Sequence, residues 1–165
     1  MNDTRVAILG LGLIGGSLGL AFRAVKEKKI HVTGYARRQE TGELALAMGA
    51  VDSMAATPQL AVAEADFVFL CTPVLQMLPM ALSVLPFMKP GALLTDAGST
   101  KRWFADSMRP LMPVGVRYIG GHPMAGREKS GLSEAMPDLF RGCWYLFAPS
   151  ADRPDAFLTQ LRQLI

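Results

Sequence analysis

The feature that most constrains the fold is a glycine motif between an apolar strand pattern and a helical pattern. Residues 6–9 (VAIL) run directly into residues 10–15 (GLGLIG), which open the helix. In such a turn the first glycine permits a tight bend, the second lets a pyrophosphate approach the backbone, and the third brings helix and strand together. The phosphates then lie at the positive end of the helix. The predicted cofactor-binding residues of this turn are Gly10, Gly12, Leu13, Ile14 and Gly15.

Glycines also serve ordinary turns, so a glycine-rich turn in an unrelated α/β domain is the alternative interpretation. The context favours a dinucleotide site, because the motif follows a strand, opens a helix and precedes a second strand pattern at Ile30–Tyr35. The pattern therefore predicts a βαβ unit that binds a dinucleotide.

The rest of the chain alternates apolar strand patterns with helical patterns, and near-continuous apolar strands are typical of a parallel sheet covered on both faces. We therefore expect an α/β fold, a Rossmann-type doubly wound and mostly parallel sheet with helices on both faces. The expected strands are Arg5–Leu9, Ile30–Tyr35, a short one near Val51, Phe67–Cys71, Ala92–Asp96, Tyr118–Ile119 and Trp144–Phe147. The expected helices are Leu13–Lys26, Gln39–Met48, Leu60–Glu64, Val74–Leu85 and Lys101–Met108, with a helical turn at Leu132–Met136.

The length of 165 residues fits one domain with a hydrophobic core. We expect residues 1–150 to form the dinucleotide-binding domain and residues 151–165 to start the connection to a further domain, with an amphipathic helix beginning at Asp155. We find neither a signal peptide nor an apolar run of the roughly 20 residues that a membrane span needs, and we expect a cytoplasmic protein.

The composition narrows the class of protein. Half of the residues are hydrophobic, which excludes a disordered chain. The net charge is +3 and the pI is about 9.1, but the basic residues are scattered, whereas a nucleic-acid binder concentrates its charge among aromatic side chains. We therefore expect neither a nucleic-acid nor a membrane partner. Cys71 and Cys143 lack metal-ligand spacing, and we expect both to be buried, reduced thiols with no metal.

The end of the second strand bears on which dinucleotide is bound. An NAD site usually has Asp or Glu there, about 20 residues after the motif, to accept a hydrogen bond from the ribose 2′-hydroxyl. This chain has Ala36, Arg37 and Arg38, with no carboxylate before Glu40. Two guanidiniums can hold a 2′-phosphate through charge-assisted hydrogen bonds, which predicts NADP, with NAD as the alternative. In the alternative interpretation the two arginines are a solvated start of the next helix.

Two later strand ends carry further candidate residues. Thr72 and Pro73 follow the strand at Phe67–Cys71, where they either lie beneath the cofactor or form a plain turn. Ser99 follows the next long strand and offers a hydroxyl, and Lys101 offers a cation. In the alternative interpretation Ser99 or Thr100 only caps the following helix, and the two roles are compatible.

A third segment, residues 120–128 (GGHPMAGRE), places His122 immediately after a strand, among glycines and a proline that restrict its backbone. A neutral imidazole there can accept a proton from a substrate hydroxyl as hydride leaves. A structural histidine is the alternative, and it is the interpretation that we adopt for His31 at the start of the second strand.

In these segments the chain resembles the prephenate/arogenate (cyclohexadienyl) dehydrogenase family, and specifically its N-terminal dinucleotide-binding domain. The resemblance covers nearly the whole chain. The segment HPMAGREKSG at residues 122–131 is far more specific than the glycine motif. The other matching segments, in chain order, are residues 10–18, 48–52, 71–74, 96–101, 140 and 144–149.

The resemblance implies oxidative decarboxylation of prephenate to 4-hydroxyphenylpyruvate, or of arogenate to tyrosine, in tyrosine biosynthesis. Hydride leaves the ring carbon that bears the 4-hydroxyl, carbon dioxide leaves the opposite carbon, and the ring becomes aromatic. The family residues that match His122 and Ser99 act at that hydroxyl, with Ser99 also near the nicotinamide. The residue that matches Glu128 shapes and gates the substrate pocket, and Gly126 is a further substrate-binding position.

Two features depart from the family pattern. The family usually has Asp where this chain has Ala36, which again favours NADP. The family also has a helical C-terminal domain that dimerises and supplies cations for the substrate carboxylates. We expect such a domain beyond residue 165, a homodimer of the full-length protein, and little turnover by this chain alone.

Two other functions remain as alternatives. Another NADP-dependent dehydrogenase of the β-hydroxyacid dehydrogenase or imine reductase type would share the glycine motif but place a catalytic lysine on a later helix. A non-catalytic dinucleotide-sensing module would have no need of Ser99, His122 and Glu128.

Overall fold

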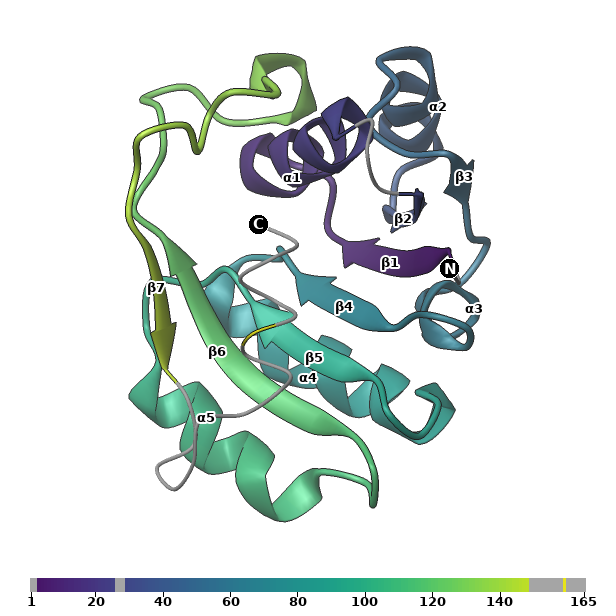
Figure 1. Cartoon of the computed structure of the whole chain (residues 1–165), viewed down its shortest axis with the longest axis vertical. Helices are drawn as coiled ribbons and strands as arrows, with labels where there is room; N and C mark the ends of the chain where they lie inside the picture. Colours follow the sequence, from purple (N-terminus) through teal and green to yellow (C-terminus); the bar gives the residue numbers. More distant parts are fainter. Residues whose placement is uncertain (1–2, 26–28, 149–158, 160–165) are drawn as a thin grey trace.

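The computed structural model describes residues 3–25, 29–148 and 159, and their strands and helices alternate as in βαβ units (Figure 1). The strands are β1 Thr4–Leu9, β2 Ile30–Tyr35, β3 Ser53–Met54, β4 Phe67–Leu70, β5 Leu93–Asp96, β6 Arg117–Pro123 and β7 Tyr145–Ala148. The α-helices are α1 Leu13–Ala24, α2 Gln39–Ala47, α3 Pro58–Val62, α4 Val74–Val84 and α5 Arg102–Met108. Short 3₁₀ turns are η1 Leu85–Phe87, η2 Arg109–Leu111 and η3 Leu132–Glu134.

The described strands form one seven-stranded sheet in the order β3-β2-β1-β4-β5-β6-β7. Strands β1 to β6 are all parallel to one another, and β7 lies antiparallel to β6 at the edge. This confirms the predicted Rossmann-type, mostly parallel α/β sheet. The strand order reverses between β1 and β4, and in such sheets a crevice opens at the carboxyl ends of the strands at that point.

The sheet separates two hydrophobic cores, because successive strand residues point to opposite faces. Val6 and Ile8 of β1 belong to the core beneath α1 and α2, whereas Ala7 and Leu9 belong to the core with α3, α4 and α5. Figure 1 shows these two layers of helices on opposite faces of the sheet. Strands β4 and β5 are buried along their whole length, which explains the continuous apolar sequence of β4, whereas β5 ends in the buried polar residues Thr95 and Asp96.

Some elements differ from the predictions. Strand β6 continues to Pro123, because β5 pairs with residues 117–120 and β7 then pairs with residues 120–123. His122 therefore lies within a strand, and the prediction that it follows one immediately is wrong. The third strand is found at Ser53–Met54, slightly later than expected. The helix predicted at residues 155–165 lies outside the described residues, apart from Thr159.

The two thiols differ in exposure. Cys143 is exposed, because it lies in the turn before β7, where its N–H bonds the carbonyl of Phe140; the predicted burial is wrong for this residue. Cys71 is partly buried after β4, and burial, together with the charge of Asp96, raises the pKa of its thiol to about 12. Among the described residues no group of His, Cys, Asp and Glu is arranged to hold a metal ion.

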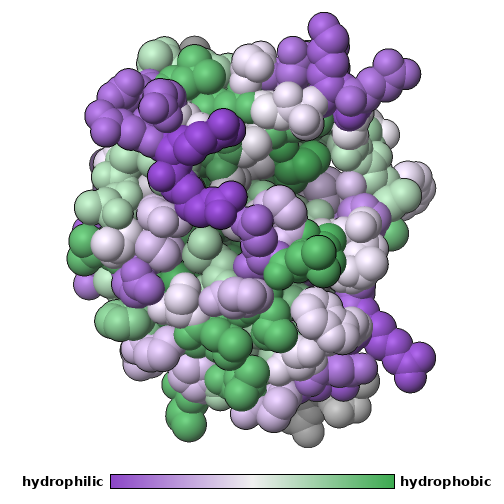
Figure 2. Space-filling model, turned by 180° about the vertical axis from the view of Figure 1, so that it is seen from behind, coloured by the Kyte–Doolittle hydropathy of each residue, from purple (hydrophilic) through white to green (hydrophobic). Residues whose placement is uncertain are grey.

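The surface mixes polar and apolar side chains. Figure 2, which views the molecule from behind, shows apolar side chains scattered among polar ones, and strongly hydrophilic side chains gathered at its upper left. No helix in the described part of the chain is both long enough and apolar enough to cross a membrane.

Candidate functional site

A cavity of about 980 Å³ lies at the carboxyl ends of the parallel strands, where the strand order reverses. It is lined by the turns after β1, β2, β4 and β5 and by the end of β6 with the loop that follows. Small-molecule and cofactor sites usually have volumes of roughly 300–1,000 Å³, so this cavity suits a large cofactor. The predicted site residues that line it are Gly10, Gly12, Leu13, Ile14, Ala36, Arg37, Arg38, Thr72, Pro73, Ser99, His122 and Gly126.

The turn after β1 uses its first two glycines differently. Gly10 has a φ of +102°, which L side chains rarely adopt, and a Cβ there would lie 2.8 Å from the carbonyl carbon of Cys71. Gly12 is the N-cap of α1, with a φ of −104°, and a Cβ there would meet nothing within 4 Å. No side chain of the described residues caps α1, so the N–H groups of its first turn are available to a ligand beside Gly12.

The next small residues of α1 bring other segments close to this turn. A Cβ on Gly15 would collide with the carbonyl oxygen of Gly10, so Gly15 sets the distance from α1 to β1 and does not line the cavity. The Ser17 hydroxyl accepts a 3.0 Å hydrogen bond from the N–H of Met136. The segment that precedes η3 reaches the cavity, which residues 125–127 and 129–131 line.

The end of β2 contributes a cationic corner. Arg37 and Arg38 are exposed and line the cavity, and Arg38 is the N-cap of α2. Within the described part of the chain, neither guanidinium forms an ion pair with a carboxylate. Ala36 packs against the core on the α1 side and leaves space beside them. An anionic group in this corner would therefore meet two cations with no competing carboxylate.

The turn after β4 presents an unpaired polar atom. Thr72 Oγ1 is buried and has no hydrogen-bond partner among the residues that the structure describes. Thr72 lines the cavity beside Gly10, and Pro73 is the N-cap of α4. Buried hydroxyls in native proteins nearly always have a hydrogen-bond partner. Thr72 Oγ1 is therefore a candidate to hydrogen-bond a bound ligand.

Ser99 lies in the loop between β5 and α5 and is exposed at the cavity. The N-cap of α5 is Lys101, and no side chain caps this helix. The alternative role of Ser99 or Thr100 as the helix cap is therefore wrong. Its hydroxyl remains available at the cavity.

Lys101 is not a free cation at the cavity, because its ammonium bonds Asp96 Oδ2 and the carbonyl oxygen of Gly121. The carboxylate of Asp96 is completely buried. Its Oδ2 also accepts a 3.0 Å bond from the Gly98 N–H, and its Oδ1 accepts a 2.6 Å bond from the Tyr118 hydroxyl. This network was not predicted from the sequence. The signal in the sequence was an Asp at the end of an apolar strand, because a buried carboxylate almost always has a charged or hydrogen-bonding partner.

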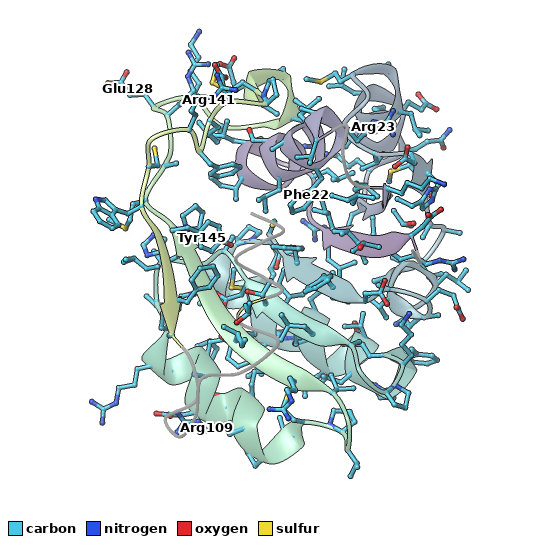
Figure 3. All side chains as sticks on the ribbon, in the orientation of Figure 1. Phe22, Arg23, Arg109, Glu128, Arg141 and Tyr145 are labelled. Carbon is cyan, nitrogen blue, oxygen red and sulfur yellow. The ribbon has the colours of Figure 1, made fainter. Side chains whose placement is uncertain are left out.

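Burial governs the protonation of this region. Burial lowers the pKa of the Lys101 ammonium, and its hydrogen bond to Asp96 opposes that shift. Burial and the charge of Asp96 raise the pKa of Tyr118 above its usual range. Burial likewise raises the pKa of Tyr145, which points from β7 toward the interior in Figure 3. Both phenols are therefore neutral near pH 7.

His122 is partly buried and lines the cavity near the end of β6. It is paired across the sheet with Leu146 of β7, which restrains its backbone. Because side chains alternate along a strand, the imidazole lies on the same face of β6 as Tyr118. The structure therefore places His122 and Ser99 at one cavity with the glycine turn.

The loop after β6 divides the remaining predicted residues. Gly126 lines the cavity, whereas Glu128 is exposed and does not. Figure 3 shows Glu128 at the outer end of this loop, projecting away from the sheet. The substrate role of Glu128 stays a prediction without support from its position here.

The charged side chains around the cavity share one sign. Arg37, Arg38, Arg127 and Lys129 line it, and no Asp or Glu does so among the described residues. Like charges around a cleft focus a positive field into it, which favours an anionic ligand. The first two of these cations were predicted from the sequence. Arg127 and Lys129 were not predicted, because their place at the cavity depends on the tertiary position of the segment before η3, which the local sequence does not reveal.

Comparison with known proteins agrees with this geometry. Residues 18–165 match the family model described as prephenate dehydrogenase, nucleotide-binding domain. The chain is 35% identical to the prephenate dehydrogenase of Bacillus subtilis (strain 168), an alignment that covers 100% of this chain and 44% of that protein. The chain thus spans about half the length of the curated relatives it matches.

Two crystal structures are similar along almost the entire chain. Synechocystis arogenate dehydrogenase has a TM-score of 0.89 at 31% identity, covering 98% of this chain and 56% of that one. Prephenate dehydrogenase from A. aeolicus, in complex with hydroxyphenyl propionate and NAD+, has a TM-score of 0.87 at 25% identity, covering 99% of this chain and 57% of that one.

Proposed function

The chain belongs to the prephenate dehydrogenase family, and we propose that it is the dinucleotide-binding part of an enzyme that oxidatively decarboxylates prephenate or arogenate in tyrosine biosynthesis. The observation that carries this proposal is one cationic cavity in which the positive end of α1 meets Ser99 and His122. The relatives named prephenate and arogenate dehydrogenase support the class of substrate.

The residues at the cavity fit a nicotinamide dinucleotide. The open space at Gly12 and the uncapped end of α1 suit a pyrophosphate. Thr72 Oγ1, buried and unpaired within the described residues, would gain a partner from the ligand. The residues that we assign to this part of the cofactor are Gly10, Gly12, Leu13, Ile14, Thr72 and Pro73, with Gly15 acting through helix packing.

The preferred cofactor in this proposal is NADP. Arg37 and Arg38 would hold a 2′-phosphate, and Ala36 would leave room for it where an NAD enzyme usually has a carboxylate. Among the described residues, no carboxylate pairs with either guanidinium. Both are therefore suited to a phosphate that carries close to two negative charges.

The side chains of this chain act on the substrate hydroxyl. The chemistry that a bound nicotinamide supplies is acceptance of hydride from the carbon that bears this hydroxyl. His122 takes the hydroxyl proton as the oxygen becomes carbonyl-like, and Ser99 hydrogen-bonds the same oxygen and helps to orient the substrate. Carbon dioxide leaves the opposite ring carbon and the ring becomes aromatic, so much of the driving force comes from the substrate. The main task of the protein is therefore orientation.

The remaining part of the proposal concerns the whole protein. Relatives are about twice as long as this chain, which supports a further domain after residues 151–165. We propose that this domain is helical, dimerises and supplies cations for the substrate carboxylates, and that Glu128 and Gly126 face it. The protein would act in the cytoplasm on a small molecule, without a nucleic-acid or membrane partner.

Two measurements test this function. Calorimetric titration of the chain with NADP and NAD should give binding of both, with NADP tighter. Assay of the complete protein with prephenate, arogenate and a short β-hydroxyacid should give turnover of one or both of the first two. Turnover of the hydroxyacid alone would favour a β-hydroxyacid dehydrogenase, and dinucleotide binding with no turnover at all would favour a sensing module.

A further inference from the structure

We propose that Lys101 and Asp96 form a positioning pair, which sets the loop that carries Ser99 against the strand that carries His122, and that Lys101 does not contact the substrate. This inference rests on the function proposed above. It concerns how two groups on different elements reach the same substrate oxygen.

Asp96 holds the loop between β5 and α5. Asp96 ends β5 and Lys101 is the N-cap of α5, so Ser99 lies in the short loop between them. The Oδ2 atom of Asp96 accepts hydrogen bonds from the Gly98 N–H and from the Lys101 ammonium. The loop is therefore held to one buried oxygen on both sides of Ser99, at the residue before it and two residues after it.

Lys101 and Tyr118 connect this loop to β6. The Lys101 ammonium also donates to the carbonyl of Gly121, the residue immediately before His122. The Tyr118 hydroxyl donates to the other oxygen of Asp96 at 2.6 Å, four residues before His122. Ser99 and His122 are thus connected through one carboxylate and one ammonium, with no long flexible segment between them.

Gly120 and Gly121 allow β6 to approach Asp96 and Lys101 closely. A Cβ on Gly121 would lie 2.7 Å from the backbone oxygen of Asp96, and a Cβ on Gly120 would lie 3.2 Å from Lys101 Cδ. Larger residues at either position would move β6 away from β5 or displace the lysine. The paired glycines before His122 therefore serve the approach of these groups.

The same geometry excludes Lys101 as a substrate cation. Its side chain is 21% exposed and its charge is matched by the buried carboxylate of Asp96. It is not among the residues that line the cavity, whereas Ser99 and His122 are. A substrate carboxylate would have to draw the ammonium away from Asp96 and leave that anion buried without its partner, which is strongly unfavourable.

The test uses three variants of the complete protein. Lys101→Met removes the ammonium and keeps an unbranched side chain of similar length. Tyr118→Phe removes one bond to Asp96 and keeps the ring contact with Phe104, whose centroid is 5.5 Å away. The control is Lys89→Met, because Lys89 forms a similar pair with Asp66 at 2.8 Å, at the opposite end of the sheet.

We expect Lys101→Met to lower kcat about 100-fold, since a displacement of about 1 Å can cost that much, and Tyr118→Phe to lower it about tenfold. The KM for the dinucleotide should change less than about threefold in both, and the shape of the pH profile should be kept. Lys101→Arg should recover part of the loss, because a guanidinium can bond both Asp96 and the Gly121 carbonyl. Lys89→Met should leave kcat unchanged.

Several results would overturn the proposal. A raised KM for the acid substrate with unchanged kcat would make Lys101 a substrate-binding cation, and loss of one limb of the pH profile would make it a proton-transfer group. Equal effects of Lys101→Met and Lys89→Met would leave no positioning role. If Lys101→Met does not fold, Tyr118→Phe decides by the same criteria.

A second readout needs no turnover, so it separates this inference from the proposed function. The imidazole NMR signals of His122 should shift in Lys101→Met and Tyr118→Phe and stay in place in Lys89→Met. Unmoved His122 signals would refute the positioning pair. A wild-type protein that turns over neither prephenate nor arogenate would instead refute the function.

Discussion

Two glycines of the same motif should respond to alanine in opposite ways. A methyl group on Gly15 would collide with the carbonyl oxygen of Gly10 and lie 3.1 Å from both Ile8 Cγ2 and Cys71 Cβ. Overpacking typically costs about 1–3 kcal/mol, and a backbone oxygen cannot rotate away, so we expect about 3 kcal/mol for Gly15→Ala. A domain of this length loses roughly 2–4 °C of Tm per kcal/mol, which predicts a fall of about 6–12 °C.

Gly12→Ala should leave the fold almost unchanged. The backbone of Gly12 has a negative φ, and a Cβ there meets nothing within 4 Å. Alanine is a poorer N-cap than glycine by a few tenths of a kcal/mol or more, and the lower entropy of the unfolded chain returns about 0.4–1 kcal/mol, so the Tm should stay within about 2 °C. The new methyl would occupy the space through which the pyrophosphate approaches, and NADP affinity should fall at least about tenfold.

Thermal unfolding by circular dichroism and calorimetric titration with NADP at 15 °C below the lower Tm would measure both effects. Wild-type NADP affinity in Gly12→Ala would refute the placement of the pyrophosphate beside this residue. An unchanged Tm in Gly15→Ala would refute the tight approach of α1 to β1. The pair serves as its own control, because both changes add one methyl group to the same turn.

Three further outcomes are expected. Arg37→Asp should weaken NADP binding about tenfold or more, because a hydrogen bond to a charged group contributes about 1.5–3 kcal/mol, and should leave NAD binding equal or tighter. Arg141→Asp makes the same charge change outside the cavity lining and should leave the ratio of NADP to NAD affinity unchanged. Equal effects of the two substitutions would contradict the 2′-phosphate site. In the complete protein His122→Asn should lower kcat about 100-fold or more with the KM for the dinucleotide kept, and an active variant would remove the proton-accepting role. Iodoacetamide at pH 8 should modify exposed Cys143 first, because burial raises the pKa of Cys71 to about 12 and keeps that thiol protonated until pH approaches this value; faster labelling of Cys71 by mass spectrometry would contradict the burial.

Local pattern was sufficient for the motif and for the order of the elements. The bend at Gly10, the start of α1 at Leu13 and the buried runs of β4 and β5 all follow from neighbours in sequence. Glycine spacing and apolar periodicity act within a few residues, so they can be recognised without knowing what packs against them. The Rossmann-type sheet follows from them, because βαβ connections permit few topologies.

Contacts between distant segments decided the rest. The length of β6, and with it the place of His122, depends on pairing with β7 more than 20 residues later. Arg127 and Lys129 lie at the cavity and Glu128 lies outside it, in a loop followed by a segment that Met136 anchors to Ser17 of α1.

The pair of Asp96 and Lys101 shows the division most clearly. The sequence alone determined that a polar segment follows an apolar strand. It also determined that the serine of this segment lies near the carboxyl ends of the strands, where ligands bind. It could not determine that the lysine turns inward, because the direction of that side chain is set by a buried carboxylate and by a carbonyl on another strand. Burial of charge is a property of the assembled layers, and only the tertiary structure brings the compensating groups together.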